Sequence, residues 1–510
     1  MDANGDGIGD IQGIISKLDY VKHLGVDVIW LSPVYASPNH DNGYDISDYY
    51  QINPEFGTMD DMDLLITKAE EKGLKIIMDL VINHTSNEHE WFKKSLNHDP
   101  AYRDYYIWKN KPNNWTSFFG GKAWDNIDDA YYLHLFAKEQ PDLNWHNPKI
   151  MEEVQNIMKY WLDKGIYGFR CDVINIIFKT SLENGRKRLV LTGLEHYHQQ
   201  EGMHQILQKL RCEVLDHYDT FTVGETVLVT PKQANDLIYP EKKELDMVFS
   251  FAHMETDQIN NKWFRTKFKP SKFIKVIAKW QKEVYWNANY LENHDQQRAV
   301  SRFADENFRA YSAKMFATLL IGLKGTPYIY QGQEIGMTNG DFKDMSEFRD
   351  VETLNVYQIA KKLGFSKKRR FKMMLRSSRD NNRTPMQWNR EGGFSTGTPW
   401  LKQNANTAYI NVESQLDHPE SILNYYIQMI EIRRKYVELV HGEFDLISMK
   451  KDVFIYQRTY EKDKIVVICN MSKVDQSIDY KYIEGTKIIG NYQNDSMVLR
   501  PYETRMYKLR

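Results

Sequence analysis

The sequence predicts an α/β protein built as a (β/α)8 barrel. Short apolar runs alternate with amphipathic, helix-like segments, which is the pattern of parallel strands joined by helices. Polar residues of catalytic type follow nearly every apolar run, and the active site of such a barrel lies where its strands end. A doubly wound open sheet is the main alternative, but it draws its ligand contacts from fewer strand ends. The barrel is therefore the predicted fold class.

Seven apolar runs are predicted as barrel strands, at residues 26–34, 74–84, 168–177, 221–226, 245–251, 286–295 and 326–334. Each run is short and bounded by polar residues, as a buried strand is. Helices are predicted between them, at residues 10–24, 59–72, 151–164 and 200–216, with a further helix at 421–437. In these segments apolar positions recur at three- and four-residue spacing, so each helix has one face to bury.

Two segments interrupt the alternation of strands and helices. Residues 85–147 are aromatic and contain many Asn residues, and they are too long for an ordinary connection. They predict an inserted subdomain after the run 74–84, which is the third barrel strand if a strand before 26–34 is counted. Residues 438–510 contain short runs of alternating pattern and predict a C-terminal antiparallel β-sandwich. The catalytic barrel is then expected to comprise residues 1–84 and 148–437.

Composition restricts the class of protein. Lys and Arg number 67 against 69 Asp and Glu, so the net charge is −2 and a dedicated nucleic-acid-binding protein is not expected. No apolar run approaches the roughly 20 residues that span a bilayer. The first residues lack the features of an export signal, and the three cysteines form no CxxC pair. We expect a cytoplasmic protein, monomeric and without a membrane partner, and interpret the basic segment 361–379 as a solvated helical face.

Five short segments carry the candidate chemistry. They are DLVINHTS (79–86), QPDLN (140–144), GFRCDVIN (168–175), FTVGE (221–225) and ENHD (292–295). Together with NGYDISDY (42–49), these ordered motifs resemble those of the α-amylase superfamily of glycoside hydrolases, family thirteen. Within that family, they are similar to the oligo-1,6-glucosidase and dextran-glucosidase group, and the resemblance covers the whole chain.

The motif carboxylates suit hydrolysis of a glycosidic bond with retention of configuration. That reaction requires a carboxylate nucleophile and a protonated carboxylic acid about 5–5.5 Å apart. The resemblance implies that Asp172 is the nucleophile, Glu225 the acid/base and Asp295 a stabiliser of the transition state. We expect a raised pKa for Glu225. Arg170 lies on the same strand face as Asp172 and is expected to keep the nucleophile ionised.

The resemblance also implies which residues bind the sugar. His84 and His294 are expected to bind hydroxyl groups of the non-reducing glucose, and Tyr44 to stack beneath its ring. Asp45 and Arg383 resemble the pair that closes the pocket beyond that glucose. A closed pocket implies an exo-acting α-glucosidase and argues against an endo-acting amylase.

Val173 follows the nucleophile and matches the residue of α-1,6-acting members, which favours small α-1,6-linked oligosaccharides such as isomaltose as substrates. An α-1,4-glucosidase and a trehalose-6-phosphate hydrolase remain alternatives, the latter with Lys262 and Lys267 as candidate phosphate contacts. Ala252 replaces the carboxylate of the family's FEHM motif, and NHDQQR (293–298) replaces NHDQPR; both changes affect the leaving-group side. The charged loop RLDRD of sucrose isomerases is absent, which favours hydrolysis.

The first residues resemble a metal-binding loop. Its oxygen ligands would be Asp2, Asn4, Asp6, the carbonyl of Ile8, and Asp10. Oxygen ligands in this alternation suit Ca²⁺ or Mg²⁺, although the loop is not an EF-hand. We expect a structural cation there, and no organic cofactor.

Family members carry one more strand before the segment that matches residues 2–10. The first barrel strand is therefore expected to be missing, which would leave the barrel with an open edge. For this reason a truncated, non-catalytic relative with a carbohydrate-binding or scaffolding role is kept as an alternative.

Overall fold

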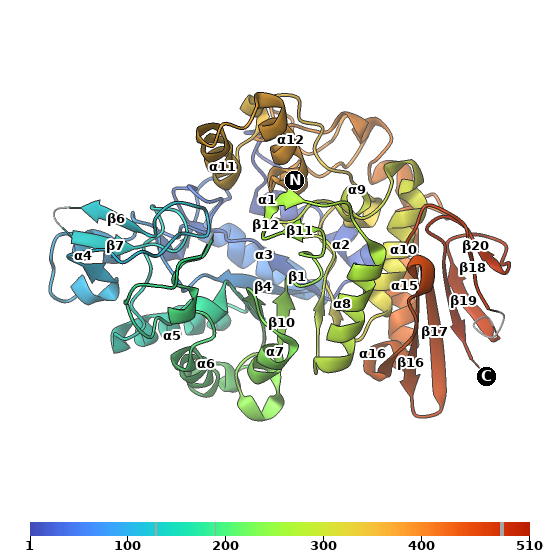
Figure 1. The fold of residues 1–510 in the computed structure, drawn as a ribbon, viewed down its shortest axis with the longest axis horizontal. Helices are drawn as coiled ribbons and strands as arrows, with labels where there is room; N and C mark the ends of the chain where they lie inside the picture. Colours follow the sequence, from blue (N-terminus) through green and yellow to red (C-terminus); the bar gives the residue numbers. More distant parts are fainter. Residues whose placement is uncertain (128–129, 189, 480–483, 510) are drawn as a thin grey trace.

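A parallel β-sheet forms the centre of the molecule in the computed structural model, which describes residues 1–127, 130–188, 190–479 and 484–509 (Figure 1). Five strands lie in the order β1-β4-β8-β9-β10. They are β1 (Val28–Leu31), β4 (Lys75–Leu80), β8 (Gly168–Cys171), β9 (Phe221–Thr226) and β10 (Met247–Ser250). The parallel pair β13 (Ala288–Asn289) and β14 (Thr326–Pro327) continues this order, because a bridge joins Val248 to Asn287.

These seven strands confirm the barrel architecture. Most are shorter than the predicted runs, and β4 and β8 end inside the motifs DLVINHTS and GFRCDVIN. β8, for example, ends at Cys171, and Val173 already has a left-handed backbone conformation. In the part of the chain that the structure describes, no strand pairs with the outer edge of β1 or of β14, so the sheet has two free edges.

Helices surround the sheet. They are α1 (Ile11–Ile15), α2 (Leu18–Leu24), α3 (Met59–Glu71), α5 (Pro148–Asp163), α6 (Glu201–Glu213), α7 (Pro231–Ile238), α8 (Pro270–Glu283) and α10 (Arg309–Gly322). α5 shows why they form: Asn147 caps its first turn, Pro148 occupies the position where no N–H is needed, and the face from Ile150 to Leu162 is buried. The single helix predicted at 10–24 is two helices, α1 and α2. Among the described residues, no helix has the length and apolar character needed to cross a membrane.

The residues after β4 form a small antiparallel unit at one end of the molecule (Figure 1). Its strands are β5 (Trp108–Lys109), β6 (Trp124–Ile127) and β7 (Ala130–Leu133), paired in the order β5-β7-β6, with α4 (Glu90–Leu96) nearby. A separate pair of strands, β2 (Tyr35–Ala36) and β3 (Asp48–Ile52), brackets the NGYDISDY motif.

The segment between β10 and the C-terminal domain contains shorter elements near the strand ends. They are β11 (Gln258–Ile259), β12 (Asn261–Arg265), α9 (Ala299–Arg302), α11 (Val351–Lys362), α12 (Lys367–Ser377), α13 (Asp380–Arg383) and α14 (Glu413–Leu416). α11 and α12 contact each other and, through α12, the strand β12. Figure 1 shows the pair at the edge of the molecule, on the opposite side from α7.

An antiparallel sheet ends the chain, as predicted. Its strands are β15 (Glu443–Ser448), β16 (Val453–Tyr460), β17 (Asp463–Asn470), β21 (Thr504–Lys508) and β19 (Thr486–Gly490), with β18 (Gln476–Ser477) and β20 (Val498–Leu499) as a separate pair. α15 (Ile422–Lys435) and α16 (Val437–His441) lead into it. Ten of the 14 residues of α10 are buried, because it lies between the barrel and this sheet. Phe316 of α10 and Tyr456 of β16 belong to one apolar core.

Trp161 connects α5 to β3. Its ring is fully buried, and its indole N–H donates to the carbonyl of Tyr49 at 2.8 Å. Trp161→Phe leaves this carbonyl without its donor, so we expect the free energy of unfolding to fall by about 1–3 kcal/mol. Calorimetric thermal unfolding measures the loss. Trp388→Phe is the control, because the buried Trp388 indole N–H has no hydrogen-bond partner among the described residues; similar losses in both variants would contradict the role of the hydrogen bond.

Candidate active site

Arg170 gathers three carboxyl groups at the ends of neighbouring strands. Its guanidinium contacts Asp79 of β4, its Nη1 atom lies 2.5 Å from Asp172, and its Nη2 atom lies 2.6 Å from Glu225 of β9. All four side chains are buried. One cation thus faces three carboxyl groups in a place where water screens little, so ionising all three together is unfavourable.

Burial is the largest cause of a raised pKa at each of these carboxyl groups, and Arg170 opposes the shift in every case. The pKa is raised to about 6 at Asp79 and at Asp172. At Glu225 it is raised to about 8, because the negative charge of Asp172 adds to the effect of burial. At neutral pH Asp172 is therefore ionised and Glu225 protonated, which are the states that a nucleophile and a general acid require.

The loops that follow β8 and β9 are joined to each other. Val173 has φ 36° and ψ 39°, an unfavourable conformation for a β-branched residue, and its N–H donates to Glu225 at 3.3 Å. Asn175 donates to the carbonyl of Val227 at 2.8 Å and accepts from the Val227 N–H at 3.0 Å. These bonds fix the position of Asp172 relative to Glu225.

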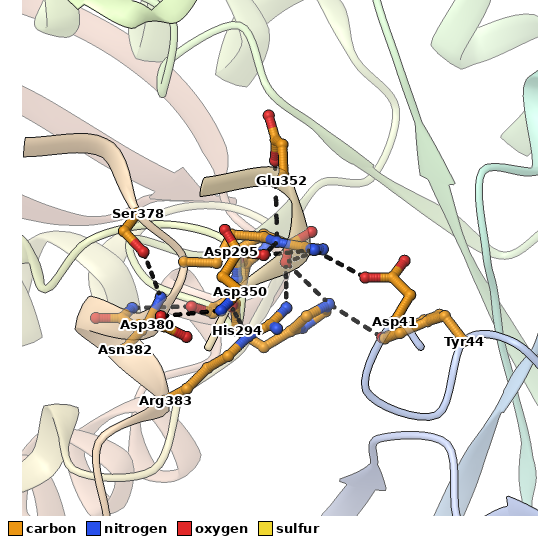
Figure 2. Close-up of polar contacts among 12 residues, drawn as sticks. Asp41, Tyr44, His294, Asp295, Asp350, Glu352, Ser378, Asp380, Asn382 and Arg383 are labelled. Carbon is orange, nitrogen blue, oxygen red and sulfur yellow. Dashed lines mark hydrogen bonds and ion pairs between the residues drawn. The ribbon is translucent and has the colours of Figure 1, made fainter. Parts of the chain in front are cut away.

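Asp295, after β13, is the most exposed of the predicted catalytic carboxylates. Its side chain is 27% exposed, and it accepts from Arg383 at 2.9 Å, with Arg379 3.5 Å away (Figure 2). Burial alone raises the pKa of Asp295, but the positive charges of Arg379 and Arg383 help to hold it below its usual range. Asp295 is therefore an ionised carboxylate that faces the open part of the site.

Aromatic and imidazole rings lie beside the carboxylates of the candidate site. Tyr44 stacks on His294 with ring centroids 5.4 Å apart and planes 16° apart, and its hydroxyl lies 3.0 Å from Nε2 of His294. His84 lies on the other side of this loop, with Nε2 3.0 Å from the carbonyl of Tyr44 and 3.1 Å from the amide of Gln140. Burial lowers the pKa of both histidines, so both rings are neutral and suited to hydrogen bonds with hydroxyl groups.

The pair predicted to close the pocket, Asp45 with Arg383, does not form. Asp45 is fully buried and accepts two backbone N–H groups of its own turn, each at 2.9 Å. Asp41 instead pairs with Arg379 at 2.8 Å, and Arg383 binds Asp295 (Figure 2). The prediction failed because aspartates recur through residues 41–48, and only the folded turn decides which of them reaches the arginines.

Two further charged residues of the site were missed in the sequence. Asp79 opens the DLVINHTS motif, and its place near the end of an apolar run is the signal that marks it as a candidate. Lys179 is fully buried, and its ammonium group lies 2.6 Å from Asp142 and 2.8 Å from Asn83. Asn83 in turn contacts Nδ1 of His84 at 3.2 Å, so Lys179 contributes indirectly, through Asn83, to the position of the histidine ring.

The acidic side chains of the N-terminal loop bind amides rather than converging on one point. Asp2 accepts from the N–H groups of Gly5 at 2.7 Å and Gly7 at 2.8 Å, and Asp10 accepts from that of Ala3 at 2.8 Å. Within the described residues, no group of three or more His, Cys, Asp or Glu side chains is arranged to hold a metal ion. The cation expected at Asp2, Asn4, Asp6, Ile8 and Asp10 therefore stays a prediction.

A protonated acid and an ionised carboxylate beside one guanidinium, where the strands of a parallel β/α barrel end, are what a retaining glycoside hydrolase requires. The chain belongs to the α-amylase family, since the model "Alpha amylase, catalytic domain" matches residues 1–442. Membership of this family confirms the resemblance noted in the motifs.

Relatives match along the whole chain. An oligo-1,6-glucosidase of Parageobacillus thermoglucosidasius is 47% identical over 100% of this chain and 96% of its own length. A trehalose-6-phosphate hydrolase of Bacillus subtilis is 42% identical over 100% of this chain and 95% of its own. Among solved structures, an isomaltulose synthase from Klebsiella sp. LX3 superposes with a TM-score of 0.96 at 38% identity, covering 100% of this chain and 96% of that one.

The carboxyl pKa values predict a bell-shaped pH profile. We expect kcat/KM to rise as Asp172 ionises near pH 6 and to fall as Glu225 loses its proton near pH 8. The profile is measured by initial rates. With a nitrophenyl glucoside, whose leaving group needs no proton, Glu225→Gln should lose the alkaline limb of kcat/KM and keep the acid limb. An alkaline limb that persists in Glu225→Gln would contradict the assignment.

Proposed function

We propose that the protein is an exo-acting α-glucosidase that hydrolyses α-1,6-glucosidic bonds of isomaltose and short isomalto-oligosaccharides with retention of configuration. The observation that carries the proposal is that Arg170 contacts both Asp172 and Glu225. These two carboxyl groups are buried and are in opposite protonation states at neutral pH. The substrate class is supported by relatives named oligo-1,6-glucosidase that are 44–47% identical to the chain.

In the first half of the proposed reaction, Glu225 gives its proton to the glycosidic oxygen as that bond breaks. An Asp172 carboxylate oxygen bonds to the anomeric carbon and forms a glucosyl-aspartate. Arg170 donates to Asp172 before the attack and so disfavours its protonation. The leaving sugar departs with the proton from Glu225.

In the second half, Glu225 removes a proton from water as the water oxygen attacks the anomeric carbon, and Asp172 is released as a carboxylate. Glucose departs with its original configuration because two inversions have occurred. Asp295 stays ionised throughout, and its negative charge favours the positive charge that develops on the sugar ring in each transition state.

The pair of Asp41 and Arg379 is proposed to close the pocket beyond the non-reducing glucose, in place of the pair first expected. Both side chains are about 5% exposed, and Arg379 also binds Asp350 at 2.7 Å. A chain extending past that glucose would have to break this buried ion pair, which is costly. This supports removal of one glucose at a time from the chain end.

A trehalose-6-phosphate hydrolase is the second candidate, since relatives of that name match the whole chain. The candidate phosphate contact Lys262 already pairs with Glu352 at 2.5 Å, so its charge is compensated. Lys267 is exposed at the surface. Because Lys262 is already paired with Glu352, an unphosphorylated leaving group is favoured.

Glucose release from isomaltose, maltose and trehalose-6-phosphate tests the proposal directly. We expect the highest kcat/KM with isomaltose, and with Asp172→Asn a fall of at least about 10⁴-fold, because the covalent step is lost while the fold is kept. Preference for trehalose-6-phosphate would overturn the assigned substrate, and activity retained by Asp172→Asn would overturn the mechanism.

Val173 is predicted to set linkage preference. Val173→Thr keeps the volume and β-branching of the side chain but adds a hydroxyl group beside the nucleophile. We expect the ratio of kcat/KM for isomaltose to that for maltose to fall by about tenfold or more, a change typical of one altered pocket contact. Val227→Thr, in the neighbouring loop, is the matched control, and an equal fall there would remove the special role of Val173.

A further inference from the structure

The hairpin of α11 and α12 concentrates positive charge on a chain that is otherwise acidic. Residues 353–379 contain nine Lys and Arg and no Asp or Glu. The whole chain has a net charge of −2, so the remainder carries −11. A segregation of this size produces a local field that attracts anions despite the near-neutral total.

Seven of these cations are exposed: Lys361, Lys362, Lys367, Lys368, Arg369, Lys372 and Arg376. None of the seven makes an ion pair within the part of the chain that the structure describes. α12 is also amphipathic, because Met374 is fully buried in a cluster with Trp263 and Phe348, while the opposite face of the helix is cationic. Packing therefore fixes which face points outward.

The turn between the two helices presents an aliphatic side chain among the lysines. Leu363 is 67% exposed, and Ile359, one turn earlier on α11, is 39% exposed. Gly364 has φ 79° and reverses the chain, so Leu363 lies at the tip, between Lys361–Lys362 and Lys367–Lys368. Exposed aliphatic groups surrounded by lysines suit an interface where apolar chains lie beneath anionic headgroups.

We propose that the α11–α12 hairpin docks peripherally on an anionic lipid bilayer, with the lysines on the headgroups and Leu363 at the level of the acyl chains. The proposed contact is reversible and stays at the surface of the bilayer, so it does not require a segment that spans the membrane. A nucleic acid would use the positive charge but would leave Leu363 and Ile359 unexplained, and so the bilayer is the better fit.

The hairpin starts and ends at the active site. Asp350 and Glu352 precede its cationic stretch, Arg379 ends it, and all three belong to the ion-pair network of the pocket (Figure 2). Docking would therefore hold the pocket near the membrane surface. This placement depends on the proposed glucosidase function, whereas bilayer binding itself does not.

Co-sedimentation of the full chain with vesicles tests the proposal. The protein should pellet with vesicles of phosphatidylcholine mixed with phosphatidylglycerol, should stay in solution with phosphatidylcholine alone, and should be released by high salt. K361Q/K362Q/K367Q/K368Q should lower the partition coefficient by more than about 100-fold, since each cation near an anionic surface contributes about fivefold. L363S should lower it at every salt concentration.

The matched control is K232Q/K272Q/K275Q/K282Q, which removes four exposed lysines from α7 and α8. It should bind vesicles like the parent protein, and all three variants should keep the parent's glucosidase activity on a small glucoside. Equal loss in the control would mean that net charge alone is responsible and would overturn the proposal. Failure of the parent to bind anionic vesicles, or binding to RNA without binding to vesicles, would also overturn it.

Discussion

The active site depends on a single buried cation. Arg170 is 2% exposed and faces three carboxyl groups, so its one positive charge cannot balance three negative charges where solvent is excluded. The proton that relieves this imbalance lies on the group with the highest pKa, Glu225. In the proposed mechanism, the division of roles between acid and nucleophile follows from charge balance around one guanidinium, and the strands bring its partners together.

Much of the fold could be predicted from the sequence, because buried parallel strands read as short apolar runs and their ends carry the motifs. The seven strands appear where predicted, but β8 stops at Cys171 because the backbone turns at Val173. Residue type alone does not predict that Val173 adopts a left-handed backbone conformation. It depends on the neighbouring loop, which holds Asn175 by two hydrogen bonds to Val227.

The candidate site was predictable where motifs named single residues and failed where several equivalent residues competed. Asp172 and Glu225 lie at the ends of β8 and β9, Asp295 lies in the loop after β13, and the structure brings the three to one region. Asp41 and Asp45 differ only in which side of a turn they occupy. Asp45 takes the inner position and binds backbone amides, which leaves Asp41 to meet Arg379. Such a choice is made by chain geometry that residue identity does not encode.

The C-terminal sheet lies beside the barrel without being an independent unit. Ten of the 14 residues of α10 are buried, and the apolar core that it shares with β16 and β17 continues into the barrel. Cutting the chain before β15 would uncover the side of α10 that packs against β17 and β21. Exchange of C-terminal modules between relatives would consequently have to carry α10 along, or redesign its outer face, if the hybrid enzymes are to stay monodisperse in solution.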